Sequence, residues 1–250
     1  MYFEIQGTNL RLAGSMHFVP AGGTVPQWVA SAYRWSEDIH LEGNVADLPK
    51  HAFLPVGQSS EFILTPALWA AVKAGWPANH PFGPLGQHKP WFIAMILGAS
   101  GIQFSNGVEP LISQSAKNDG RAIRYLEDVG EFAGLLDSIP AADYERSIRL
   151  TLNNPVAARA AIVANIYKAW LRGDAEAVLN AMLASAMNQF PAIRSAMLDA
   201  RNALWLPRII QMANFPKRTL IFVGAGHLGG ASGLLAMLTR AGFHLTPLLR

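Results

Sequence analysis

Residues 1–12 alternate apolar and polar side chains on either side of Gly7-Thr8-Asn9, and this period of two predicts a β-hairpin. Pro26 is a favourable first residue for a helix, since the N–H that proline lacks has no partner in the first turn. Apolar residues follow it at helical spacing up to Trp35. Residues 38–43 predict the next strand. The first part of the chain is therefore expected to form a strand–loop–helix–strand unit.

The middle of the chain has a different pattern. Residues 44–64 are rich in Pro, Gly and Ser and predict an irregular segment. Residues 65–215 have mostly helical spacing with many alanines, so they predict a large helical section. One interruption, at residues 121–127, has the pattern of an internal strand that ends in an acidic residue.

The last part of the chain returns to a strand pattern. Residues 219–223 form a continuous apolar run, typical of a strand that is buried on both faces. A helix at about 231–241 and a strand around 245–249 are predicted after it. We therefore expect an α/β (α+β-like) fold. Its mixed central sheet is built from N- and C-terminal βα units, a helical insertion lies at about residues 65–215, and residues 1–250 form a single domain.

Composition narrows the class of protein. The 250 residues are 51% hydrophobic and 15% charged and include no cysteine, which excludes disulfides, zinc fingers, iron–sulfur clusters and a thiol nucleophile. The net charge of +3 comes from scattered basic residues and does not indicate nucleic-acid binding. The N-terminus does not resemble a signal peptide, and the longest apolar stretch, residues 91–102, is too short for a transmembrane segment. A cytoplasmic protein is expected.

Two turns of the same kind carry the candidate chemistry. Gly14-Ser15-Met16-His17 and Gly224-Ala225-Gly226-His227 each follow an apolar strand and precede glycines and a helix. Ligands of open α/β sheets bind outside the carboxyl ends of the strands, so both imidazoles are expected in one cleft, where Glu42 also emerges. Two imidazoles and a carboxylate are typical ligands of a divalent metal such as Mn, Co or Zn, or of non-haem iron.

Other interpretations of these turns remain open. A loop histidine can simply satisfy backbone groups, in which case both turns are structural. The glycines at 224, 226 and 229 also match the GxGxxG pattern of dinucleotide-binding proteins. However, no second βαβ half follows them, and no acidic residue stands about twenty positions further on to hold a ribose.

These residues resemble the marks of the TraB/GumN (TIKI-like) family. The marks are two widely separated GxxH motifs, an acidic residue after the first βα unit, a mid-chain Leu-Glu strand end and an Arg-Asn pair on a late helix. His17 and His227 close the two motifs, and Glu42, Leu126-Glu127 and Arg201-Asn202 match the other marks in order. The resemblance covers nearly the whole chain.

The family resemblance implies a function as well as a fold. Animal members are metal-dependent peptidases, and distant relatives include haem-binding and ester-hydrolysing proteins. The chain departs from the family at Gly107-Val108-Glu109, where Asp is frequent in place of Glu, and at Glu131-Phe132, where Glu-Gln is usual. These departures affect the expected substrate more than the fold.

We therefore expect a metal-dependent hydrolase, peptidase- or esterase-like, that acts on a peptide or on a small ester or amide. The predicted metal ligands are His17, His227 and Glu42, and the predicted catalytic residues are Glu42, Glu127, Arg201 and Asn202. The alternative function is a non-catalytic protein of the same fold that binds a metal, haem or peptide.

Two candidate residues have alternative roles. Glu127 is either a general base or a charge at a helix N-terminus. Arg201 either binds an oxyanion or a substrate carboxylate, or forms a structural salt bridge with Glu42 or Glu127.

A shared metal requires the coordinating nitrogens of His17 and His227 to lie roughly 3–4 Å apart, and a separation above about 12 Å would rule it out.

The other histidines have structural interpretations. His40 points to the same face of its strand as Glu42 and is expected in the core. His51, His80 and His88 lie in loops beside prolines and are expected to be solvated.

Overall fold

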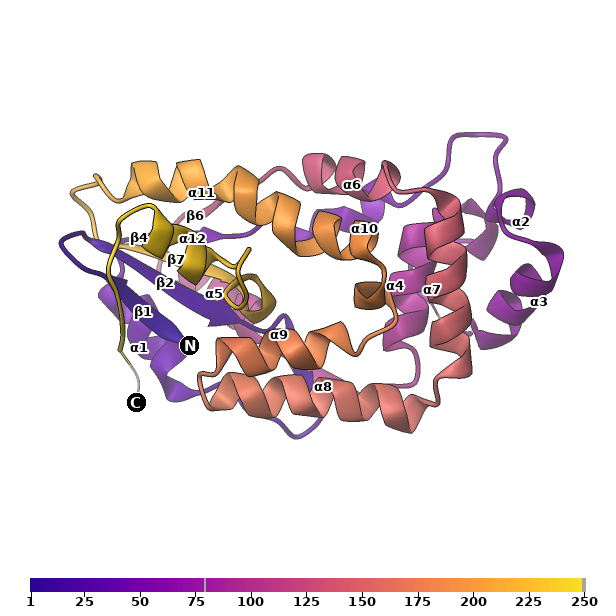
Figure 1. The fold of residues 1–250 in the computed structure, drawn as a ribbon, viewed down its shortest axis with the longest axis horizontal. Coiled ribbons are helices and arrows are strands. Elements are labelled where there is room, and N and C mark those ends of the chain that lie inside the picture. Colours follow the sequence, from indigo (N-terminus) through magenta and orange to yellow (C-terminus); the bar gives the residue numbers. More distant parts are fainter. Residues whose placement is uncertain (79, 249–250) are drawn as a thin grey trace.

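A computed structural model describes residues 1–78 and 80–248 of the chain. Its centre is a six-stranded sheet in the order β6-β4-β7-β2-β1-β8 (Figure 1). The strands are β1 (Tyr2–Ile5), β2 (Leu10–Ser15), β4 (Asp38–Leu41), β6 (Ile123–Tyr125), β7 (Thr219–Gly224) and β8 (Leu245–Pro247). β1 is antiparallel to both β2 and β8, whereas β2, β7, β4 and β6 run parallel. The predicted mixed sheet is confirmed.

The central strand, β7, joins the two ends of the chain. All five residues from Thr219 to Val223 are buried, as their continuous apolar run predicts. β7 lies between β2 and β4, with Ser15 paired to Gly224. Because β2 and β7 are parallel and in this register, the two GxxH turns leave the same edge of the sheet side by side.

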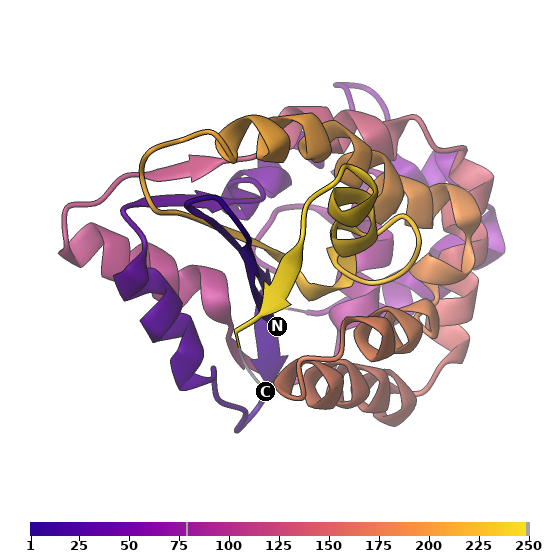
Figure 2. The ribbon, with the colours of Figure 1, turned by 60° about the vertical axis from the view of Figure 1, so that its left-hand side comes forward.

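Helices cover both faces of the sheet (Figure 2). One face carries α1 (Gln27–Trp35) and α5 (Val108–Asn118), and the other carries α11 (Ala200–Met212) and α12 (Leu234–Arg240). Two further helices, α8 (Val156–Leu171) and α9 (Ala175–Leu183), pack against each other near the carboxyl edge of the sheet (Figure 1). Trp170 and Trp205 anchor α8 and α11 in the core and are fully buried.

The rest of the insertion forms a second hydrophobic core. Pro66 and Pro90 begin α3 (Pro66–Gly75) and α4 (Pro90–Ala99), where the missing N–H of a proline costs no hydrogen bond. The other elements of this part are η1 (Val45–His51), α2 (Ser60–Ile63), η2 (Leu85–Gln87), α6 (Val129–Asp137), α7 (Ala141–Asn153), η3 (Met187–Gln189), α10 (Pro191–Arg194) and the π-helix η4 (Ser195–Asp199). Their apolar residues form a cluster separate from that of the sheet. A single domain stays a prediction.

Two short strands were not predicted. β3 (Phe18–Pro20) and β5 (Phe104–Asn106) form a separate antiparallel pair, and β5 interrupts the segment predicted as helical. Three residues are too few for a period of two to be recognised in a sequence. Of the predicted final strand at 245–249, Leu245–Pro247 is observed, and residue 249 lies outside the described residues.

Among the described residues, no helix is long and apolar enough to cross a bilayer.

Candidate active site

The two GxxH turns converge on one carboxylate. Glu42 follows β4, and its Oε2 lies 3.9 Å from Nε2 of His17, while its Oε1 lies 3.6 Å from Nε2 of His227. Gly224 N–H also donates a hydrogen bond to Oε1 of Glu42. A Cβ atom on Gly224 would lie 2.9 Å from this oxygen, so glycine allows the carboxylate to approach the backbone.

Glu42 is held in its charged form. Burial opposes ionisation, but the charges of Arg201, His227 and His17 and the Gly224 N–H together lower the pKa of Glu42 to about 2. Nη2 of Arg201 provides the closest of these charges, at 2.8 Å from Oε2 of Glu42. The carboxylate is therefore an anion at neutral pH and pairs with the buried guanidinium of Arg201.

Arg201, on α11, is at the centre of the buried network. It donates from Nε and Nη2 to Glu127, from Nη2 to Glu42, and from Nη1 to His227 Nε2 at 3.2 Å and to the Met197 carbonyl at 3.1 Å. These five contacts use all five N–H donors of the guanidinium group. The salt bridges to Glu42 and Glu127 match the structural alternative predicted for Arg201.

Glu127 is the second buried carboxylate that binds Arg201. It follows β6, and its backbone N–H donates to the Glu42 carbonyl, which ties together the ends of β6 and β4. Its carboxylate accepts from Arg201 and, at 3.0 Å, from Nε1 of Trp205. Burial raises the pKa of Glu127 despite the opposing effect of Arg201.

His227 is a buried, neutral imidazole. Its Nδ1 lies 2.7 Å from Oδ1 of Asn202, whose Nδ2 donates to the Ser232 carbonyl. Nδ1 of His227 is therefore the donor, and Nε2 accepts from Arg201. Burial, together with the charges of Arg201 and His17, lowers the pKa of His227 to about 3, and the charge of Glu42 opposes this shift.

His17 has a different environment, because it pairs with a carboxylate on the other face of the sheet. Its Nδ1 lies 3.1 Å from Oε1 of Glu109, near the N-terminus of α5, and Glu109 also accepts from the Ser15 hydroxyl. The Nδ1 side of the ring is buried, and this desolvation disfavours a charged imidazole, but Glu109 and then Glu42 outweigh it and raise the pKa of His17 to about 9.

The backbone fixes this pair. The N–H groups of Gly107 and Val108 donate to the carbonyls of His17 and Met16, so the start of α5 docks directly on the GxxH turn. A Cβ atom on Gly107 would overlap the Met16 carbonyl. Glycine at position 107 is therefore needed to bring Glu109 next to His17.

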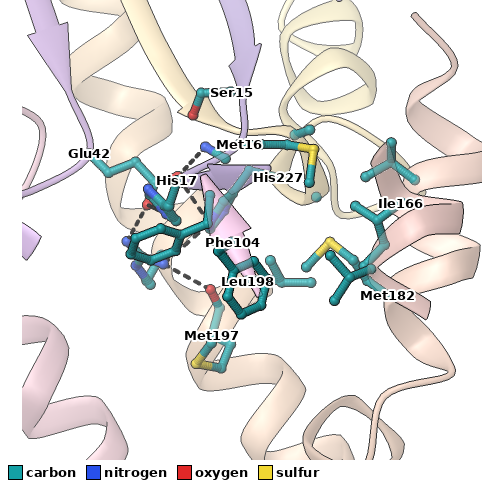
Figure 3. Close-up of a pocket in the computed structure, with 17 residues that line it drawn as sticks. Ser15, Met16, His17, Glu42, Phe104, Ile166, Met182, Met197, Leu198 and His227 are labelled. Carbon is teal, nitrogen blue, oxygen red and sulfur yellow. Dashed lines mark hydrogen bonds and ion pairs between the residues drawn. The ribbon is translucent and has the colours of Figure 1, made fainter. Parts of the chain in front are cut away.

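A cavity of about 300 Å³ opens beside these groups (Figure 3). His17, Glu42, Arg201 and His227 line one end of it, and apolar side chains line the rest. The side chain of His17 is 38% exposed, compared with 4% for Glu42, 6% for Arg201 and 4% for His227. His17 is thus the ionisable group that a ligand in this cavity can reach.

The site has the donor types of a metal centre but not the arrangement. Among residues 1–78 and 80–248, no group of three or more His, Asp or Glu side chains is placed to hold one ion. N–H groups of Arg201 bind His227 Nε2 and Glu42 Oε2, two of the atoms that a metal would need. A metal does not fit this arrangement unless Arg201 moves.

Five predicted site residues come together around one network: His17, Glu42, Glu127, Arg201 and His227. Both imidazoles lie within 4 Å of the same carboxylate, so the separation that would rule out a shared site does not occur. Asn202 contacts the network through His227 but does not line the cavity. The catalytic and metal-binding roles of these residues stay predictions.

The structure adds Glu109, Ser15 and Trp205 to the site. Glu109 was noticed in the sequence as a departure from the family pattern, but nothing there indicated its contact with His17. The only trace of Glu109 in the sequence is its place in the Gly-Val-Glu sequence at the start of α5, and this does not reveal its partner.

Four other histidines can be compared with their predictions. His51 is exposed, as expected, whereas His80 is only partly exposed and its ring packs against Trp76. His40 is buried, as expected, and pairs with Asp38 outside the site. The prediction that His88 is solvated was wrong, because its ring is fully buried against Phe53 and Phe92.

Comparison with known families identifies the family of the chain. The model of the TraB/PrgY/gumN family matches residues 3–247, so the chain belongs to this family, which confirms the resemblance seen in its motifs. No curated protein and no solved structure matches the chain.

Proposed function

We propose that this protein hydrolyses a carboxylic ester or amide, with His17 as the general base. The observation that carries the proposal is the exposure of His17 in a cavity whose other ionisable groups are buried and bound to one another. A general base has to reach the proton that it abstracts, and its orientation has to be fixed by a third group. Oε1 of Glu109 lies 3.1 Å from Nδ1 of His17 and is the charged group that restricts the ring in this proposal.

The reaction follows general base and general acid steps. Neutral His17 takes a proton from water at Nε2 while the water oxygen forms a bond to the substrate carbonyl carbon. Glu109 and Glu42 stabilise the imidazolium that results, since both carboxylates face the ring. The imidazolium then gives its proton to the leaving alcohol or amine as the carbonyl–oxygen or carbonyl–nitrogen bond breaks, which restores neutral His17.

The remaining residues of the network are positioning residues in this proposal. All N–H groups of Arg201 are engaged, so it acts by holding Glu42, Glu127 and His227 in place. Asn202 fixes the His227 ring by accepting from Nδ1. Metal binding by His17, His227 and Glu42 stays a prediction, and no step of the proposed reaction requires it.

A second function is favoured by the same network. Because Glu42, Arg201 and His227 satisfy one another, the cavity suits a protein that binds an apolar ligand without turnover. In such a protein, His17 would contribute to the affinity for the ligand and would have no catalytic role.

The test is hydrolysis of p-nitrophenyl esters and anilides by the purified chain, compared with His17→Ala and His244→Ala. His244 is exposed and lies outside the cavity, so its substitution is the matched control. We expect His17→Ala to lower kcat by about 10²–10⁴-fold, the usual contribution of a general base, and His244→Ala to leave kcat unchanged. Equal activity of all three proteins would contradict the proposal, and binding without any hydrolysis would favour the second function.

A further inference from the structure

The cavity has one polar end and a long apolar wall. Figure 3 places Glu42 at one side and Ile166 and Met182 at the other. The apolar wall comes from elements far apart in the chain, with Met16 and Phe104 near the sheet, Ile166 and Met182 on α8 and α9, and Met197 and Leu198 on η4. A ligand that reaches His17 would therefore place its remaining atoms against carbon and sulfur.

The nature of the wall indicates a flexible apolar ligand. Three of the side chains named above are methionines, which adapt their shape to what they contact because they are unbranched. Phe18 extends the same surface outwards, since it lines the cavity, is 57% exposed and packs against Phe104. A volume of about 300 Å³ lies at the small end of ligand pockets.

From these observations we infer that the substrate is an ester or amide of an unbranched apolar acid of medium length, whose acyl chain fills this cavity. This inference rests on the proposed function and names its substrate class. The carbonyl group lies at the His17 end, and the methylene groups lie along the apolar wall. The leaving alcohol or amine points out of the cavity past Phe18.

A peptide suits the cavity less well. Each residue of a peptide carries an N–H and a carbonyl that need partners when they are buried. The polar side chains that line the cavity are at the end near Glu42, and most of their donors and acceptors already have protein partners. An acyl chain has no such groups beyond its carbonyl.

Binding is measured separately from catalysis with ketones, which contain a carbonyl but no scissile bond. Isothermal titration of the full chain with 2-pentanone and 2-nonanone compares ligands that differ by four methylenes. Burial of a methylene strengthens binding about fourfold, so 2-nonanone should bind at least about tenfold more tightly. Equal affinities of the two ketones, or no binding of either, would overturn the inference.

Two substitutions on α8 locate the binding site. Ile166 lines the cavity, and Ile166→Phe fills part of it, whereas Leu171→Phe adds the same ring at an exposed position of the same helix. We expect Ile166→Phe to weaken binding of 2-nonanone about tenfold and to leave 2-pentanone within about twofold. Leu171→Phe should change neither affinity. The same loss in both variants would place the ligand elsewhere and overturn the inference.

Hydrolysis of p-nitrophenyl butanoate and octanoate separates the two proposals. Faster hydrolysis of the octanoate, with the preference reduced in Ile166→Phe, supports both. Hydrolysis that is equal for the two esters, or faster for an apolar peptide anilide, keeps the hydrolase and overturns the acyl-chain inference. If the affinity for the ketones depends on chain length but no ester is hydrolysed, the inference that the cavity binds an acyl chain is supported and the proposed hydrolase activity is contradicted.

Discussion

Nη2 of Arg201 lies 2.8 Å from Oε2 of Glu42, and this contact joins α11 to the end of β4 across 159 positions of the chain. Both side chains are buried, so the pair is removed from the water that would otherwise screen it. The same guanidinium binds Glu127 and His227, so one side chain determines the geometry of three others.

Arg201→Gln should destabilise the fold strongly. The substitution leaves the buried carboxylates of Glu42 and Glu127 without their cation, which costs about 3–5 kcal/mol in comparable buried pairs. Arg218→Gln is the control, because Arg218 pairs with Glu37 at the surface and such pairs contribute about 0–1 kcal/mol. Urea unfolding of the three proteins measures the free energies of unfolding, and similar losses for the two variants would contradict the central role of Arg201.

His227 should stay neutral well into the acid range. Burial and the neighbouring charges of Arg201 and His17 lower its pKa to about 3, and its proton lies on Nδ1, facing Asn202. Nitrogen NMR of the imidazoles should show the Nδ1–H tautomer of His227 unchanged from pH 7 to pH 5. An ordinary titration of His227 between pH 6 and 7 would show that the ring is not held as described.

Glu109→Gln should shift the pH profile of hydrolysis. Burial favours the neutral His17 ring, but Glu109 and Glu42 raise its pKa to about 9, so the fraction of neutral base and the value of kcat/KM rise with pH up to that range. Removal of the Glu109 charge should move the midpoint of this rise down by about one pH unit or more. A lower kcat/KM with an unchanged midpoint would indicate a purely structural role for Glu109.

The predicted binding of a metal by His17, His227 and Glu42 would depend on Arg201. The predicted ligands His227 and Glu42 are bound by Arg201 N–H groups, so an ion has to displace the guanidinium. We expect added Mn²⁺, Co²⁺ or Zn²⁺ to raise the Tm of Arg201→Gln more than that of the wild type, because the substitution frees these acceptors. Equal shifts in both proteins, retained when His17 and His227 are replaced by Ala, would contradict metal binding by these residues.

Much of the site could be predicted because it follows from the sheet. Residues 219–223 indicated a strand buried on both faces. In the structure this strand is parallel to its two neighbours, and parallel strands end at one edge, which brings His17, His227 and Glu42 together. Glu109 could not be placed, because α5 follows the three-residue strand β5, whose pattern is too short to recognise. The apolar wall depends on how α8 and α9 pack, which sequence periodicity does not specify.

The role of Arg201 shows a second limit of the sequence. A lone arginine in an apolar stretch needs a partner, and both Glu42 and Glu127 were plausible partners. The sequence could not show that Arg201 binds both carboxylates, or that it also donates a hydrogen bond to His227. Saturation of all its donors is a property of the folded geometry alone.

Chemical rescue of His17→Ala tests the central claim most directly. The variant lacks the proposed base but keeps the cavity, which free imidazole can enter because the position of His17 is partly exposed. The measurement is the kcat of p-nitrophenyl butanoate hydrolysis with increasing imidazole, after subtraction of the rate without protein. We predict that imidazole restores part of the lost activity in a saturable manner in His17→Ala and leaves His244→Ala unchanged. An activity of His17→Ala that equals the wild type, or a loss that imidazole does not reverse, would contradict general base catalysis by His17.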